Sequence, residues 1–129
     1  MNPLTTEWIS KAEADFATAS REIRARICPN YDAVCFHCQQ CVEKYLKALL
    51  QEADVPFDRT HNLVVLLDVL RPVHSDLALL RPELHALSTY AIHVRYPGES
   101  ADVDTARHAL RLCRAVRKVL RAELGLVQP

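Results

Sequence analysis

The protein has 129 residues, 50% of them hydrophobic, and it carries 16 basic and 16 acidic side chains. This length and apolar content favour one folded domain over residues 1–129 and exclude a disordered chain. The zero net charge excludes a strong overall attraction to nucleic acid or to an anionic membrane, so any such attraction must come from a local patch. Gly98 and Gly125 are too few glycines for the turns of a β-sandwich or barrel, and the composition therefore predicts an all-α fold.

The apolar segments and the first residues bear on the cellular location. No apolar run reaches the roughly 20 residues that cross a bilayer. Met1 to Leu4 lack the charged and apolar regions of a secretory signal. We therefore expect a cytoplasmic protein that has no membrane partner and whose five cysteines remain reduced thiols.

The apolar spacing predicts a first helix from Thr5 to Ile27, capped by Thr5 or Thr6 and ended by Pro29. Its apolar residues are three or four positions apart: Trp8, Ala12, Phe16, Ala19, Ile23 and Ile27.

A second helix is expected from Tyr31 to about Glu52, with Pro56 breaking the chain after it. Its inner face contains Val34, Cys38, Cys41, Tyr45 and Leu49. Four polar residues are expected to point away from this face, namely Gln40, Glu43, Lys44 and Lys47. The spacing of Glu43 and Lys47 suits an i,i+4 ion pair.

Two short helices are expected next. Residues 60–62 are cap-type residues, with His61 expected as the cap, and they precede a leucine-rich helix that Pro72 stops. The following segment carries Leu77, Leu80, Leu84 and Leu87, and Pro82 within it indicates a fresh helix start.

After a loop over residues 96–100, the last helix is expected from Ala101 to about Leu124, with Gly125 ending it. Its inward residues are Val103, Ala106, Leu110, Cys113, Val116 and Leu120. Three long and two short helices predict an antiparallel up-and-down bundle.

The cysteines form a C-x-x-C-x-x-C pattern at Cys35, Cys38 and Cys41, with His37 between them and Cys28 nearby. Thiolates at this spacing bind zinc or an iron–sulfur cluster when the backbone forms a tight loop. The helical period continues through them, however, and residues three apart on a helix drift by roughly 60°, which leaves three thiolates poorly placed for one ion. We therefore favour small core residues and expect no metal and no cofactor.

Two sets of basic residues are candidates for phosphate binding. The larger set falls on one stripe of the last helix: Arg107, Arg111, Arg114, Lys118 and Arg121. The smaller set, Arg21, Arg24 and Arg26, ends the first helix. The alternative is a solvated face, since cations are also favoured near a helix C-terminus. Arg117 lies beside the stripe, where its stem would pack against neighbouring helices or its charge would pair with Glu43 or Asp15.

The segment from His93 to Pro97 contains a histidine, a guanidinium and Tyr96, which together suit RNA cleavage or nucleotide binding. On a helix His93 and Arg95 would diverge, whereas on extended backbone both would point to the same side. The alternative is that Arg95 joins helices by hydrogen bonds. No glycine-rich phosphate loop, G-x-S-x-G or H-E-x-x-H motif is present.

Nearly the whole chain resembles the HEPN domain. The residues that carry this resemblance are Trp8, Ala12, Asp15, Tyr31-Asp32-Ala33, the segment from Gln39 to Leu50, Thr60-His61-Asn62-Leu63 and Arg95-Tyr96-Pro97. The most specific part is the Gln-Gln-x-x-Glu-Lys-x-x-Lys-Ala pattern over residues 39–48.

The resemblance implies an up-and-down bundle that forms a homodimer and acts with a minimal nucleotidyltransferase, in a two-component or toxin–antitoxin pair. It also implies either nucleotide binding or scaffolding, or a metal-independent ribonuclease with an Arg-x(4–6)-His motif near the last helix. Here the positions after Arg95 that would hold the histidine are Ser100, Ala101 and Asp102. Arg81 to His85 is one residue short of the motif, and a proline interrupts it.

Three hypotheses follow. The favoured one is a nucleotide- or RNA-related binding module with a nucleotidyltransferase partner; the others are a ribonuclease toxin with an altered site, using Arg95 and His93, and a purely structural dimerisation domain. The candidate ligand-binding residues are Arg95, Tyr96, Lys44, Lys47, Arg107, Arg111, Arg114 and Lys118.

Overall fold

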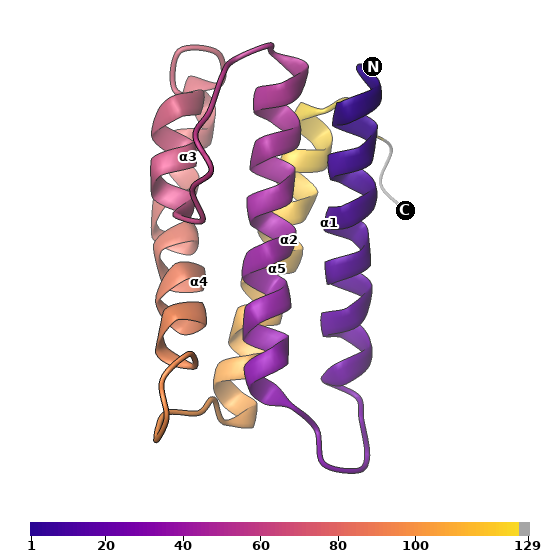
Figure 1. Cartoon of the computed structure of the whole chain (residues 1–129), viewed down its shortest axis with the longest axis vertical. Coiled ribbons are helices and arrows are strands. Elements are labelled where there is room, and N and C mark those ends of the chain that lie inside the picture. The colour runs from indigo at the N-terminus through magenta and orange to yellow at the C-terminus, as the bar shows by residue number, and fades with distance from the viewer. Residues whose placement is uncertain (127–129) are drawn as a thin grey trace.

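The computed structural model describes residues 1–126, and this part of the chain contains α-helices, one 3-10 helix and no strand. The elements are α1 (Pro3–Glu22), α2 (Tyr31–Glu52), α3 (Leu63–Leu70), the 3-10 helix η1 (Ser75–Leu80), α4 (Arg81–His93) and α5 (Val103–Glu123). The helices lie along one long axis, and the start of α1 and the end of α5 lie at the same end (Figure 1). The predicted helical bundle of three long and two short α-helices is confirmed, with η1 in addition; residues 127–129 of the expected domain lie outside the described residues.

The first helix differs from the prediction at both ends. Asn2 caps it by accepting a hydrogen bond from the Leu4 N–H at 2.8 Å, and Thr5 is buried inside the helix. The helix ends at Glu22, and Ile27 is 85% exposed in the connecting loop. The Glu22 carboxylate accepts the Asn30 N–H at 2.6 Å, which holds the loop that turns the chain back into α2. The prediction of helix to Ile27 was wrong because an apolar residue at the right spacing does not by itself provide a neighbour to pack against.

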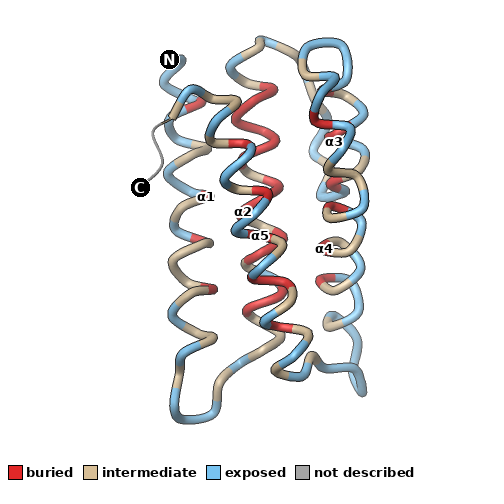
Figure 2. Tube along the Cα trace, turned by 180° about the vertical axis from the view of Figure 1, so that it is seen from behind, coloured by how far each residue is buried: buried red, intermediate tan, exposed pale blue. Residues whose placement is uncertain are grey.

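The central helix is α2, which packs against α1, α3, α4 and α5. Its bounds match the prediction, and buried residues follow it along its length (Figure 2). Glu43 and Lys47 were expected to point away from the core, but they are only 2% and 6% exposed. This expectation was wrong because helices cover α2 on more than one side, so its polar residues are buried as well.

The remaining elements begin where caps and prolines place them. Asn62, and not His61 as expected, caps α3 by accepting the N–H groups of Val64 and Val65. Pro82 lies in the first turn of α4, which confirms the predicted fresh helix start. Asp102 caps α5 by accepting the Thr105 N–H at 2.8 Å.

Four of the five cysteines are buried in the core: Cys35, Cys38, Cys41 and Cys113. Burial raises the pKa of the Cys35 thiol to about 11, as expected for a thiol packed among apolar side chains. The structure therefore agrees with the interpretation of these cysteines as small core residues. No helix of residues 1–126 combines the length and apolar character needed to cross a membrane.

Candidate functional site

A pocket of about 190 Å³ lies where α2, the start of α3 and the last turns of α4 meet. It is lined by Gln39, His61, Asn62, Ser88, Ala91, Ile92 and Arg95. The pocket combines the Gln39 amide of α2 with an imidazole from the loop before α3 and a guanidinium from the loop after α4, whereas Ala91 and Ile92 supply an apolar wall. Such a mixture of a few polar groups with an apolar surface is typical of a small-ligand site.

Beneath the pocket, the buried Glu43 carboxylate joins the side chains that position its rim. It accepts hydrogen bonds from Lys47 Nζ at 2.9 Å and from Gln39 Nε2 at 3.1 Å, and it lies 3.1 Å from His61 Nδ1. Gln39 Nε2 also donates to the His61 carbonyl at 2.9 Å. A buried carboxylate requires several such partners to offset its desolvation. These contacts, here called the Glu43 cluster, fix the segment before α3 against α2.

Arg95 brings positive charge to this pocket. Its guanidinium is exposed and forms no ion pair with any described residue, residues 1–126. Asn62 lines the same pocket at the N-terminus of α3, where the helix dipole is positive. Since the Glu43 carboxylate is already bound by Lys47, Gln39 and His61, the pocket suits an anionic ligand.

His93 and Arg95, the candidate catalytic pair, do not share this pocket. α4 continues to His93, and Val94 keeps a helical conformation (φ −76°, ψ −2°), so the two side chains diverge. His93 Nε2 lies 2.7 Å from Glu99 Oε2, and it lines a different hollow with Tyr96. The alternative in which both side chains project from extended backbone is therefore excluded.

The two candidate lysines of α2 form internal ion pairs and do not line the pocket. Lys44 Nζ lies 2.5 Å from Asp15 Oδ2, which ties α2 to α1. Lys47 is buried against Glu43 and lies 5.5 Å from the centre of the Trp8 ring. Neither lysine is therefore placed to contact a ligand in the pocket, and Lys47 is linked to its rim only through the Glu43 cluster.

The basic stripe of α5 is separate from the pocket, which no residue of α5 lines. Four of its members are exposed, namely Arg107, Arg111, Arg114 and Lys118. Arg121 instead donates to the Tyr45 hydroxyl at 3.0 Å. Arg117 pairs with neither Glu43 nor Asp15: it donates two hydrogen bonds to Glu13, at 2.7 and 2.6 Å, and its guanidinium carbon lies 4.3 Å from the centre of the Phe16 ring.

The residues that sequence reasoning did not assign to a site are Gln39, His61, Asn62 and Ser88. One signal pointed to Gln39: together with Glu43 and Lys47 it forms a polar i,i+4 row beside an apolar row at positions 38, 42 and 46. A polar row inside an apolar segment indicates buried groups that bind one another. No comparable signal marks Ser88.

A model of one protein family, described as HEPN domain, matches residues 5–123 of the chain. No curated protein and no solved structure matches the chain significantly. The family match extends from the first turn of α1 to the end of α5, so it includes every residue that lines the pocket. It implies a nucleotide- or RNA-related function. The chain belongs to the HEPN domain family.

Proposed function

We propose that the protein is a cytoplasmic nucleotide- or RNA-binding module that binds a phosphate group of its ligand at Arg95. The observation that carries this proposal is the Arg95 guanidinium, which has no carboxylate partner among residues 1–126 and lies in a pocket with the N-terminus of α3. A guanidinium and a helix N-terminus together are a common phosphate-binding arrangement. His61, whose Nδ1 faces Glu43, would offer its exposed Nε2 to the rest of the bound group, and Gln39 would hold His61 in place.

The pocket size fits part of a nucleotide. Ligand pockets commonly have volumes of roughly 300–1,000 Å³, and this one has about 190 Å³. A phosphate or a base edge would occupy it, and the remainder of the ligand would extend over the surface. A longer RNA would then place further phosphates on the exposed members of the α5 stripe, such as Arg107 and Arg111.

The alternative of a ribonuclease toxin is less well supported. Its candidate pair, His93 and Arg95, diverges at the end of α4, and Ser100, Ala101 and Asp102 hold the positions of the motif histidine. The third alternative, a purely structural dimerisation domain, gives no role to an arginine that lines a pocket and has no carboxylate partner among residues 1–126.

We further propose that the protein forms a homodimer and acts with a minimal nucleotidyltransferase, in a toxin–antitoxin or related pair. This part rests on the family and on the residues 39–48 that resemble it most closely. Co-expression with a nucleotidyltransferase encoded beside it, followed by co-purification and light scattering, tests both the partner and the dimer.

The affinity for a nucleotide or an RNA tests the pocket. We expect Arg95→Ala to bind fluorescent ATP or a short single-stranded RNA about 10- to 100-fold more weakly than the unsubstituted chain, as the loss of one charge-assisted phosphate contact predicts. Arg71→Ala removes another exposed arginine, outside the pocket, and should leave binding unchanged. Equal binding by Arg95→Ala and the unsubstituted chain, or no binding by either, would overturn the assignment.

A further inference from the structure

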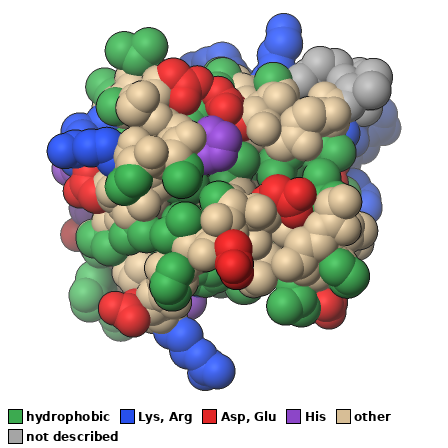
Figure 3. Space-filling view, turned by 90° about the horizontal axis from the view of Figure 1, so that it is seen from above, with side chains coloured by type: hydrophobic (Ala, Val, Ile, Leu, Met, Phe, Trp, Pro, Cys, Tyr) green, Lys and Arg blue, Asp and Glu red, His purple; other side chains and the backbone are tan. Residues whose placement is uncertain are grey.

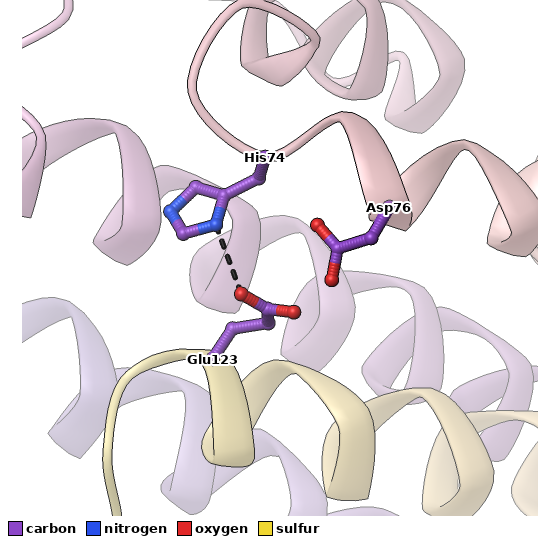
Figure 4. A group of neighbouring side chains, drawn as sticks. All are labelled: His74, Asp76 and Glu123. Atoms are coloured by element: carbon purple, nitrogen blue, oxygen red, sulfur yellow. Dashed lines mark hydrogen bonds and ion pairs between the residues drawn. The ribbon is translucent and has the colours of Figure 1, made fainter.

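Three potential metal ligands converge at the end of the bundle where α5 finishes. His74 and Asp76 lie at the start of η1, and Glu123 lies in the last turn of α5. One ligand atom from each lies within 4.8 Å of the other two. Their side chains point toward one another from the two elements (Figure 4), and His74 Nδ1 lies 2.9 Å from Glu123 Oε2.

The local backbone explains how His74 reaches this position. After Pro72, the His74 N–H donates to the Leu70 carbonyl at 2.8 Å, and this turn directs the chain into η1. His74 occupies the cap position of η1 without forming a side-chain cap, because its imidazole faces Glu123. The His74 and Glu123 side chains are only 22% and 23% exposed, so their rotamers are restricted by packing.

The charges at this end of the molecule favour a cation. Asp76 and Glu123 bring two carboxyl groups together, with one oxygen of each within 4.8 Å of the other. Viewed from above, this end shows acidic side chains and a histidine within the face, whereas Lys and Arg project at its rim (Figure 3).

We propose that His74, Asp76 and Glu123 form a site for a divalent transition metal of the zinc class. One imidazole nitrogen and two carboxylate oxygens suit Zn²⁺, Co²⁺ or Mn²⁺, whereas Ca²⁺ and Mg²⁺ prefer oxygen ligands alone. Bonds of about 2.0–2.2 Å place tetrahedral ligand atoms roughly 3.3–3.6 Å apart, so small side-chain rotations would close the observed spacing. Three protein ligands leave a coordination position for water.

The bound ion would act as a clasp between η1 and α5. It would join residues 74 and 123, which are 49 positions apart. Because an ion that binds only the folded state stabilises it by mass action, the clasp would raise the melting temperature. This site lies outside the Arg95 pocket, and the inference does not depend on the proposed function.

Metal titration of the full chain tests the site. After treatment with EDTA and its removal, calorimetry with ZnCl₂ should give one ion per chain and a higher melting temperature. Glu123→Gln and His74→Gln keep the size and hydrogen bonding of the side chains, and each should weaken binding about 10-fold or more. His93→Gln is the matched control, since His93 pairs with Glu99 but has no third metal ligand beside it among residues 1–126. This substitution should leave Zn²⁺ binding unchanged.

Two outcomes would overturn the proposal: no binding of Zn²⁺, Co²⁺ or Mn²⁺, or binding that both ligand variants leave intact. A spectroscopic measurement on the unsubstituted chain covers the case in which a variant fails to fold. Bound Co²⁺ should show the weak visible bands of nitrogen and oxygen ligation. An intense thiolate-to-cobalt band in the near ultraviolet would assign the ion to the cysteines and contradict the site.

Discussion

Two glutamates, the buried Glu43 and the partly buried Glu13, each bind a basic side chain but differ in structural role. The Glu43 side chain is 3% exposed and is bound by a lysine, a glutamine and a histidine beneath the Arg95 pocket. The Glu13 side chain is 34% exposed and is bound by Arg117 and by the Tyr45 hydroxyl, away from that pocket. The first cluster holds a loop that shapes the pocket, and the second joins α1 to α2 and α5. A buried carboxylate therefore indicates a site only where its partners also reach an open surface.

The largest expected effect follows from Glu43→Ala. The substitution leaves the Lys47 ammonium buried without its carboxylate, and we expect the free energy of unfolding to fall by about 3–5 kcal/mol. Urea unfolding followed by circular dichroism measures the change. Because the loop before α3 loses its anchor, nucleotide affinity should fall too, at temperatures where the variant remains folded.

The double variant Glu43→Met, Lys47→Met is the control for this effect. It replaces the ion pair by apolar chains of similar length, and a buried pair treated in this way commonly costs little. The double variant should therefore recover most of the free energy of unfolding that Glu43→Ala loses. It still lacks the contact between His61 and Glu43. A double variant as unstable as Glu43→Ala would show that the cost comes from the lost contacts of Glu43 with Gln39 and His61, not from an unpaired charge.

Periodicity predicted α2 and α5 well because each has a continuous apolar face, and Pro82 located the start of α4. The caps predicted for α1 and α3 were wrong. Periodicity failed for Glu43 and Lys47 because spacing shows which face is apolar, not how many neighbours surround a helix. The pocket could not be predicted from the periodicity of the sequence for a similar reason. Its groups come from residues 39, 61 and 95, and only the tertiary packing brings these together. The divergence of His93 and Arg95 depended on where α4 ends, which spacing did not determine.

A smaller effect is expected for Glu13→Gln. The amide keeps the shape of the side chain but removes the charge that Arg117 faces, and we expect a loss of about 1–2 kcal/mol in the same unfolding experiment. The Arg95 pocket has no contact with this cluster, so nucleotide affinity should stay unchanged. A fall in affinity comparable to that of Glu43→Ala would remove the distinction between the two clusters.

The pH dependence of stability provides the internal control for Glu13. Burial raises the pKa of this carboxyl, but hydrogen bonds from Arg117 and Tyr45 outweigh burial and hold the pKa below its usual 4.5. A carboxyl with a lowered folded-state pKa contributes stability above its unfolded-state pKa and loses that contribution as the pH falls through the folded-state value. The stability gap between the unsubstituted chain and Glu13→Gln should be full at neutral pH and shrink below pH 4.5.

The smallest expected changes in stability follow from removing one helix cap in each of the two regions. Asn62 caps α3 at the pocket, and Asn2 caps α1, the helix that carries Glu13. Replacing either by alanine should cost about 1 kcal/mol, because the first N–H groups of the helix lose their acceptor. Asn62→Ala should also weaken ATP binding, since Asn62 lines the pocket and orients the N-terminus of α3, whereas Asn2→Ala should not. If both variants weakened ATP binding equally, the weaker binding would be a consequence of the lower stability of the whole protein. A local role of α3 in binding the phosphate would then be wrong.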